Sequence, residues 1–321
     1  MRPATWRSSL AAVALISLAA CSTTGAATLE SPSPKPSAEP EPAPSLPKVS
    51  AYSVAAGEPG PAVKRAAVRF VEALINYDDG GGTPQAARAR LAAVGARQAL
   101  AESAGPLLVR DGAQAGEAIY PQLGGLTTTS ASVMTVVRLH RERNGRASSV
   151  TRTLDIRLAK TRSRWNVTGI ASTGGDRPAA RRLEAAAVKV LADSRIILPD
   201  SARWDIEAGR VDPRVLRLML ALAGKHTIAV TVLSTGHPLH VYGRRSVSNH
   251  RKGRAVDIWA VDGRSVAQQR AGRSNAAKAV AVAALVQGAD EVGAPWALSA
   301  GRGASFTNTV HLDHLHVGLK R

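Results

Sequence analysis

The histidines of this 321-residue chain are concentrated near its C-terminal end, beside acidic residues. Seven of the eight lie between residues 226 and 316. His250 precedes Asp257 by seven residues, and His314 and His316 form a His-x-His pair. Imidazole nitrogens and carboxylate oxygens are zinc ligands, and a catalytic zinc site needs three protein ligands and a position open to water. The pattern therefore predicts a zinc site in this part of the chain.

The segments around these residues read as helices and strands that can position them. Apolar runs predict buried strands, and an Asp or Ser before a helical stretch predicts an N-cap. Residues two apart in a strand share a face, so His314 and His316 can point into one cleft. The expected elements are a helix over 213–224 capped by Asp212, strands over 228–233 and 256–261, a helix over 275–287 capped by Ser274, and a last strand with the His-x-His pair.

Two motifs carry a resemblance to a known family. Residues 248–257 read SNHRKGRAVD and match the SxHxxGxAxD motif of the zinc D-Ala-D-Ala carboxypeptidases, and residues 311–316 read HLDHLH and match a closing His-x-x-His-x-His. Residues 179–321 thus resemble these peptidases and the murein endopeptidases, which share the hedgehog-like fold. The resemblance implies that the zinc ligands are His250, Asp257 and His316, and that Ser248 binds substrate.

The resemblance leaves the general base open between two residues. Asp313 takes the position where relatives have a Glu or Asp base, and His314 opens the His-x-His pair. If the strand begins by residue 313, Asp313 points away from the metal and His314 points toward it. If the strand begins at His314, Asp313 could turn inward. Both are therefore candidate catalytic residues, and His311 is a weaker candidate that would support a ligand.

The chain departs from the family at one position. Relatives carry an Arg just after the strand that precedes the first ligand, and its charge stabilises the oxyanion. Here residues 234–238 read STGHP. His237 could replace the Arg as a catalytic donor, or Arg244 and Arg245 could reach in from the next loop. Losing one such donor lowers the rate by about 10² to 10³, so this departure is compatible with weak activity, with altered specificity or with no activity.

Residues 61–175 are expected to form a small α+β accessory domain. Apolar residues at three- and four-residue steps predict a helix from Pro61 to about residue 75, and a second helix is expected over about 84–104. Three strands are expected over 132–139, 149–158 and 165–170, with a turn at Asn144-Gly145. Helices followed by a strand meander resemble the nuclear-transport-factor-2-like cone. His140 is interpreted as a solvated strand-end residue, and no pattern here indicates chemistry.

The first 60 residues predict an export signal and a tether. Arg2 and Arg7 flank a basic start, and the apolar run over 10–20 is too short to span a bilayer. Residues 18–21 read LAAC and resemble the bacterial lipobox. The resemblance implies that residues 1–20 are a lipoprotein signal peptide and that Cys21, the sole cysteine, carries a lipid. The proline-rich stretch over 21–60 predicts a disordered tether.

Composition excludes several classes of protein. One cysteine cannot form a disulfide framework or a thiolate zinc cluster. Lys and Arg number 42 against 24 acidic residues, a net charge of +18. This charge fits an anionic neighbour such as nucleic acid, anionic lipid or a cell-wall polymer, and it equally fits the Arg and Ala codon usage of a GC-rich genome. With 3% aromatic residues on an exported chain there is little to stack bases on, so nucleic acid is not an expected partner.

These observations predict an α+β protein that works on the extracytoplasmic face of a bacterial membrane, held there by a lipid anchor at Cys21. The expected function is that of a zinc metallopeptidase, a hydrolase that cleaves peptide bonds in peptidoglycan stem peptides or cross-links. The alternative is a non-catalytic, zinc-containing wall-binding lipoprotein with a degenerate peptidase fold. The bond that is cut and the oligomeric state are not indicated.

Overall fold

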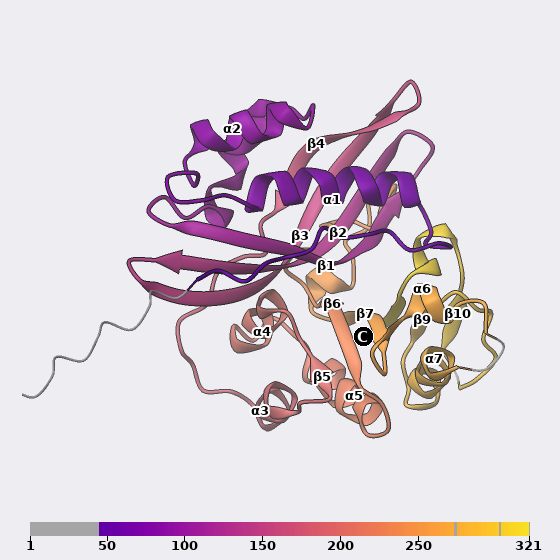
Figure 1. Ribbon diagram of the computed structural model, residues 1–321. Coiled ribbons are helices and arrows are strands. Elements are labelled where there is room, and N and C mark those ends of the chain that lie inside the picture. The colour runs from indigo at the N-terminus through magenta and orange to yellow at the C-terminus, as the bar shows by residue number, and fades with distance from the viewer. Residues whose placement is uncertain (1–44, 273–274, 302, 321) are drawn as a thin grey trace, which may run out of the picture. The chain divides into compact units, whose positions relative to one another are not determined.

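The structure is a computed structural model that describes residues 45–320 except 273, 274 and 302. The predicted signal peptide, Cys21 and the proline-rich stretch up to residue 44 lie outside the described residues. Helices and two β-sheets make up the described chain, which confirms the mixed α+β class (Figure 1). Among the described residues, no helix combines the length and the apolarity that a bilayer crossing requires.

The N-terminal part of the structure begins with helices. They are α1 (Pro61–Ile75), α2 (Pro84–Ala93) and a 3₁₀ helix (Gln98–Leu107). α1 has Pro61 in its first turn and buries one face, as its apolar spacing predicts. The predicted single helix over 84–104 is wrong in its second half, because the α-helix ends before Gly95, which adopts a left-handed φ of 70°.

Four antiparallel strands form the first sheet in the order of the sequence, and α1 lies across one face of it (Figure 1). They are β1 (Ala113–Leu126), β2 (Ser130–Arg143), β3 (Arg146–Thr161) and β4 (Arg164–Ser172). Asn144 and Gly145 both have positive φ and make the predicted two-residue turn between β2 and β3. Nothing in the sequence predicts β1, because its glycines and Pro121 are residue types that strands avoid.

The segment before α1 is attached to the structure rather than free. Residues 45–60 form no regular helix or strand, as expected of a tether. However, the backbone N–H of Tyr52 donates to Glu72 Oε1 at 2.7 Å, and Glu58 is only 6% exposed. The expected disorder is therefore wrong for this part of the tether, because Glu58 forms an ion pair with Lys64 of α1.

The second sheet belongs to the C-terminal part and contains strands of both directions. Its helices are α3 (Ala185–Ala192), α4 (Asp200–Glu207), α5 (Pro213–Ala223), α6 (Val266–Gln269) and α7 (Ala276–Val286). Its strands are β5 (Ile196–Ile197), β6 (Ile228–Val232), β7 (Ala255–Val261), β8 (Arg264–Ser265), β9 (Glu291–Gly293), β10 (Ala304–Phe306) and β11 (Leu315–Gly318). The strand order is β10-β9-β11-β7-β6-β5, with β8 paired to β7, so β11 lies between β9 and β7.

Most C-terminal elements agree with the predicted ones. Asp212 caps α5, and β6 and β7 are the expected buried strands. The side chain that caps α7 is Asn275 rather than the predicted Ser274, which lies outside the described residues. β11 begins at Leu315, so His314 lies just before the regular strand.

Two hydrophobic cores fill the described structure, one for each sheet. One takes its buried residues from 63–167 and the other from 187–319. Polar groups meet between them: the Thr153 backbone N–H donates to Ser201 Oγ at 3.1 Å, and the Thr153 hydroxyl donates to the Thr231 carbonyl at 2.6 Å. Directed hydrogen bonds, which demand one alignment of the partners, thus join β3 to the second sheet.

A buried carboxylate fixes the turn that follows β6. Asp205 on α4 is fully buried, and its Oδ2 accepts hydrogen bonds from the backbone N–H groups of Ser234 (2.8 Å) and Thr235 (2.7 Å). Its Oδ1 accepts from the Thr235 hydroxyl at 2.6 Å and from Arg210 Nε at 2.8 Å. These bonds hold the turn that carries His237.

Removing this carboxylate should strongly destabilise the protein. Asp205→Ala leaves several buried donors without an acceptor, so we expect the free energy of unfolding to fall by about 3 kcal/mol or more. Glu102→Ala is the control, because it breaks an exposed ion pair with Arg88 and should change the free energy by about 0.5 kcal/mol or less. Urea denaturation measures both. Equal stability of the two variants would show that Asp205 does not hold the turn.

Candidate metal centre

The three predicted ligands come from one turn and two neighbouring strands. Asp257 lies on β7 and His316 on β11, where they face each other directly in the antiparallel ladder. His250 begins the short 3₁₀ turn that precedes β7. Gly253 ends that turn with a φ of 69°, and a Cβ there would lie 2.0 Å from the Arg210 carbonyl oxygen. The motif glycine is therefore required for the turn to carry His250 back to β7.

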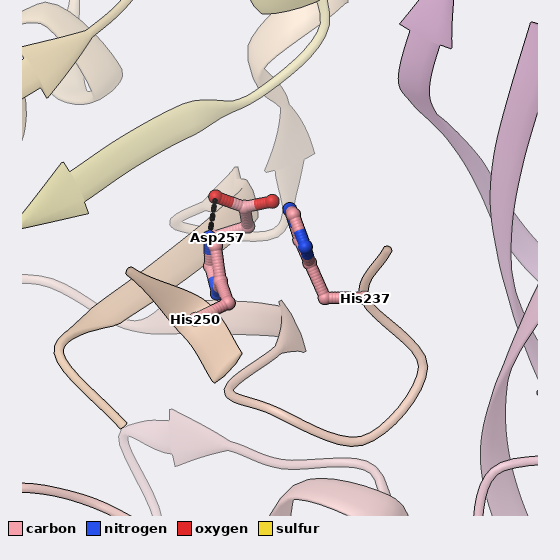
Figure 2. A group of neighbouring side chains, drawn as sticks. All are labelled: His237, His250 and Asp257. Atoms are coloured by element: carbon pink, nitrogen blue, oxygen red, sulfur yellow. Dashed lines mark hydrogen bonds and ion pairs between the residues drawn. The ribbon is translucent and has the colours of Figure 1, made fainter. Parts of the chain in front are cut away.

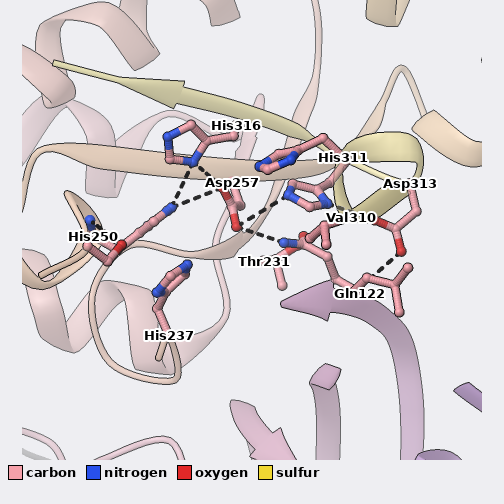
Figure 3. Close-up of polar contacts among 12 residues, drawn as sticks. Gln122, Thr231, His237, His250, Asp257, Val310, His311, Asp313 and His316 are labelled. Atoms are coloured by element: carbon pink, nitrogen blue, oxygen red, sulfur yellow. Dashed lines mark hydrogen bonds and ion pairs between the residues drawn. The ribbon is translucent and has the colours of Figure 1, made fainter. Parts of the chain in front are cut away.

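The ligand atoms of these residues form a small triangle (Figure 3). His250 Nε2 lies 3.0 Å from Asp257 Oδ1 and 3.1 Å from His316 Nδ1, and His316 Nδ1 lies 3.0 Å from Asp257 Oδ1. All three side chains are buried. Ligands of a tetrahedral zinc ion, at about 2.0–2.1 Å from the metal, lie roughly 3.3 Å from one another. The triangle is thus close to the size that zinc requires.

Hydrogen bonds on the outer side of each ring determine which nitrogen carries a proton. His250 Nδ1 lies 2.8 Å from the Leu233 carbonyl oxygen, and His316 Nε2 lies 3.3 Å from Glu291 Oε1. Both oxygens can only accept, so these nitrogens donate and the inward nitrogens carry lone pairs. Lone pairs from two imidazoles and from Asp257 therefore meet at one point. Such a point requires a positive charge, either a metal ion or a proton.

A further histidine, His237, lies over the ring of His250. The two rings are nearly parallel, at 13°, with centroids 4.0 Å apart. Ligand atoms of His237, His250 and Asp257 lie within 4.8 Å of one another, and this group could hold a metal ion. Figure 2 shows a ring nitrogen of His237 pointing toward the Asp257 carboxylate. His237 Nδ1 lies 2.8 Å from the Pro238 carbonyl oxygen and donates to it, so Nε2 is an acceptor.

This tautomer bears on the role expected for His237. Burial holds the pKa of His237 well below its usual value, and the stacked His250 lowers it further. The ring is therefore neutral near pH 7, and its Nε2 can bind a metal ion or accept a proton. Donation to an oxyanion would need a second proton on the ring. The arrangement favours an acceptor or ligand role over the predicted donor role.

Opposite charges around the triangle outweigh the effect of burial. Burial alone would raise the pKa of Asp257, but His250 and His314 hold it well below its usual value. Burial alone would lower the pKa of His316, but hydrogen bonds to Asp257 and Glu291 raise it to about 9. The bond to His316 in turn lowers the pKa of Glu291 to about 2. Without a metal ion, the proton on His316 thus supplies the positive charge at neutral pH.

The structure distinguishes the two candidates for the general base. Asp313 is fully buried, and its Oδ2 lies 2.7 Å from Lys64 Nζ and accepts from the Leu123 backbone N–H at 3.0 Å. Its Oδ1 lies 2.7 Å from His314 Nδ1, which donates to it. His314 Nε2 is consequently left facing the cluster, 3.7 Å from Asp257 Oδ2. His314 Nε2 therefore faces the cluster, whereas both carboxylate oxygens of Asp313 are held by other partners.

The cluster opens into a cavity of about 740 Å³ whose walls come from both sheets. Ser248, predicted to bind substrate, and His311, the weaker candidate, both line it. Of the two arginines considered as substitutes for the family Arg, Arg244 lines this cavity and Arg245 lines a neighbouring hollow. A small peptide thus has room beside the ligand atoms, with a cation at the wall.

Some polar contacts of the centre come from residues that no sequence pattern marks. Glu291 on β9 holds His316, Gln122 on β1 donates to Asp257 Oδ2 at 2.7 Å, and Lys64 on α1 holds Asp313. Two of these residues, Lys64 and Gln122, lie within residues 61–175, where the sequence indicated no chemistry. Gln122 and Asp257 are 135 residues apart, so only the tertiary structure reveals their contact.

The fold and the site define a mixed α+β protein with a buried group of histidine and aspartate side chains that could hold a metal ion. Comparison of the chain with protein-family models, with curated proteins and with solved structures finds no match. The resemblance of residues 248–257 and 311–316 to the zinc D-Ala-D-Ala carboxypeptidases stays a prediction.

Raising the pH should destabilise the metal-free protein as His316 loses its proton. Its pKa rises on folding from 6.5 to about 9, so the stabilisation is complete below pH 6.5 and disappears as the pH rises through about 9. The shift corresponds to about 3 kcal/mol of the free energy of unfolding. Denaturation of chelator-treated protein at a series of pH values measures this loss.

The control for this prediction is His316→Gln, which has no proton to lose at this position. Its free energy of unfolding should lack the decline between neutral and alkaline pH, and wild-type protein loaded with zinc should also lack it, because the metal replaces the proton. A decline of equal size in metal-free wild type and His316→Gln would contradict the assignment.

Proposed function

We propose that residues 179–321 form a zinc metallopeptidase that hydrolyses peptide bonds in peptidoglycan stem peptides or cross-links. The observation that supports it best is the meeting of three lone pairs, from His250, Asp257 and His316, beside a cavity large enough for a peptide. Two neutral imidazoles and one carboxylate are a zinc ligand set. The peptide substrate follows from the motif resemblance, and the net charge of +18 suits an anionic wall polymer.

The chain itself supplies the groups that move protons and hold substrate. A bound zinc ion would lower the pKa of a water molecule and polarise the peptide carbonyl. His314 Nε2 accepts the proton of the attacking water and returns it to the leaving amine. Asp313 keeps His314 in the tautomer that makes this acceptance possible, and Ser248 binds substrate at the cavity wall.

One observation favours the second function, a non-catalytic zinc-containing lipoprotein that binds the wall. The Nε2 lone pair of His237 faces the same cluster and could complete a set of four protein ligands. Zinc sites with four protein ligands are closed and structural, since no position is left for water. The two functions therefore differ in whether His237 binds the metal.

Metal content tests the ligand set. His250→Ala, Asp257→Ala and His316→Ala should each lose the bound zinc, because three ligands leave no spare. His226→Ala is the control, since His226 lies near the surface and pairs with Asp262 instead. Zinc measured by elemental analysis after dialysis should equal one per chain in wild type and in His226→Ala. Full zinc in all three ligand variants would refute the centre.

Digestion of purified muropeptides tests the activity. The soluble protein should cleave them with zinc present, lose the activity with a chelator and regain it with added zinc. His314→Ala should lower kcat by about 10² to 10⁴ while zinc stays bound, since a general acid–base contributes that much without being a ligand. His237→Ala decides between the two functions. If zinc is lost from that variant and wild type cleaves no muropeptide, the binding function replaces the peptidase.

We also propose that the protein is anchored by a lipid on Cys21 at the extracytoplasmic face of the membrane. Cys21→Ala should shift the protein from the membrane fraction to the soluble fraction or leave the precursor uncleaved, because the thioether to the lipid cannot form. Immunoblots of fractionated cells measure this. Finding wild type and variant equally soluble would exclude the anchor.

A further inference from the structure

Lys64 is a cation buried deep in the described structure. It lies in the first half of α1, and its side chain has no solvent exposure. Its Nζ forms ion pairs with Glu58, from the segment before α1, and with Asp313, at 2.7 Å, from the segment before β11. Burying an ion is unfavourable unless partners surround it, so this lysine forces those two distant segments together.

Lys64 and His314 contact different oxygens of the Asp313 carboxylate. Oδ2 is held by Lys64 Nζ and by the Leu123 backbone N–H, and Oδ1 receives the proton of His314 Nδ1. The Tyr120 hydroxyl also donates to the Asp313 carbonyl, at 3.2 Å. With its carboxylate and carbonyl both held, Asp313 cannot rotate, and the His314 ring is fixed with Nε2 toward the cluster.

Gln122 of β1 makes a second connection to the centre. Its Nε2 donates to Asp257 Oδ2 at 2.7 Å, and its Oε1 accepts from the Thr231 hydroxyl on β6. An ionised carboxylate only accepts, so the amide nitrogen must face Asp257. Because Oδ2 is taken, Oδ1 is left as the one oxygen that faces His250 and His316 (Figure 3).

We infer that the N-terminal sheet and its helix are part of the metal centre, with Lys64 positioning His314 through Asp313 and Gln122 positioning Asp257. This inference rests on the proposed function for the role of His314, whereas the role of Gln122 needs only metal binding. If these contacts merely hold the two sheets together, their loss would lower stability alone. If they position the centre, their loss changes zinc affinity and turnover in a folded protein.

Zinc affinity tests Gln122 without any assay of activity. Gln122→Leu should weaken zinc binding by about 10- to 100-fold, the usual effect of removing a partner of a ligand. Gln114→Leu is the matched control, because Gln114 is a buried glutamine of the same strand that bonds the Ile75 carbonyl, far from the ligands. Competition with a chromophoric chelator measures both. Equal affinity in the two variants overturns the role of Gln122.

Two measurements test the positioning role of Lys64: the turnover number kcat and the NMR resonance of the His314 Nδ1 proton. Glu58→Gln/Lys64→Met removes the cation without leaving Glu58 as a buried unpaired charge, and it should lower kcat by about 10-fold or more with KM and zinc content unchanged. In wild type, the His314 Nδ1 proton should give a downfield NMR resonance, identified by its absence in His314→Ala. In Glu58→Gln/Lys64→Met this resonance should shift or vanish. Arg90→Met is the control, since Arg90 is a partly buried cation of the same domain that donates to the backbone carbonyls of Ala73, Leu74 and Gly81 rather than to Asp313 or His314.

A third substitution tests whether Lys64 acts through Asp313. Adding Asp313→Asn to Glu58→Gln/Lys64→Met should lower kcat little further, because the loss of Lys64 and the loss of the Asp313 carboxylate both act on the position of the His314 ring. A double variant with unchanged kcat and an unshifted His314 resonance overturns the role of Lys64. If wild type cleaves no muropeptide, the proposed function fails, while the resonance and the zinc affinities still decide the inference. If the Lys64 variant does not fold, the comparison of Gln122→Leu with Gln114→Leu decides it.

Discussion

Three lone pairs that meet within 3.0–3.1 Å repel one another unless a positive charge lies among them, and much of the molecule is arranged around that constraint. The direct pairing of β7 with β11 sets Asp257 opposite His316. The Leu233 carbonyl and Glu291 hold the outward protons of the two rings, so the lone pairs cannot turn away. A metal ion could therefore replace the proton in this cluster with little rearrangement.

Two buried aspartates, Asp257 in this cluster and Asp313 beside it, have different partners and therefore different chemical properties. Asp257 is balanced by imidazoles and keeps one oxygen directed at the cluster. Asp313 is balanced by Lys64, an ammonium that cannot leave the interior, and its oxygens are committed to fixed partners. A carboxylate with a permanent counter-ion holds its neighbours in place, whereas the positive charge beside Asp257 is a proton on His316 that a metal ion could replace. In the proposed peptidase, proton transfer is therefore assigned to His314.

The sequence predicts the parts that depend on local chemistry. The α5 cap at Asp212 and the buried β7 each follow from nearby residues and appear in the structure. β1 could not be predicted, because its glycines and proline contradict strand propensity and only pairing with β2 makes it a strand. Lys64 and Gln122 could not be predicted as parts of the centre either. A lysine on an amphipathic helix is ordinarily solvated, and only the opposing segment shows that this one is enclosed.

The position of β11 in the sheet governs the order in which the protein can fold. The last strand in the sequence is inserted between β9 and β7, so the second sheet stays divided until the C-terminal residues arrive. Leu123 and Asp313, which bond each other, are 190 residues apart, and closing such a loop is among the slowest steps of a folding reaction. A nascent chain therefore exposes open strand edges of the second sheet until residues 315–318 have been synthesised. Because His316 lies on β11, the atoms of the candidate metal centre come together only after this strand has paired with β7, so metal binding there could not guide the early stages of folding.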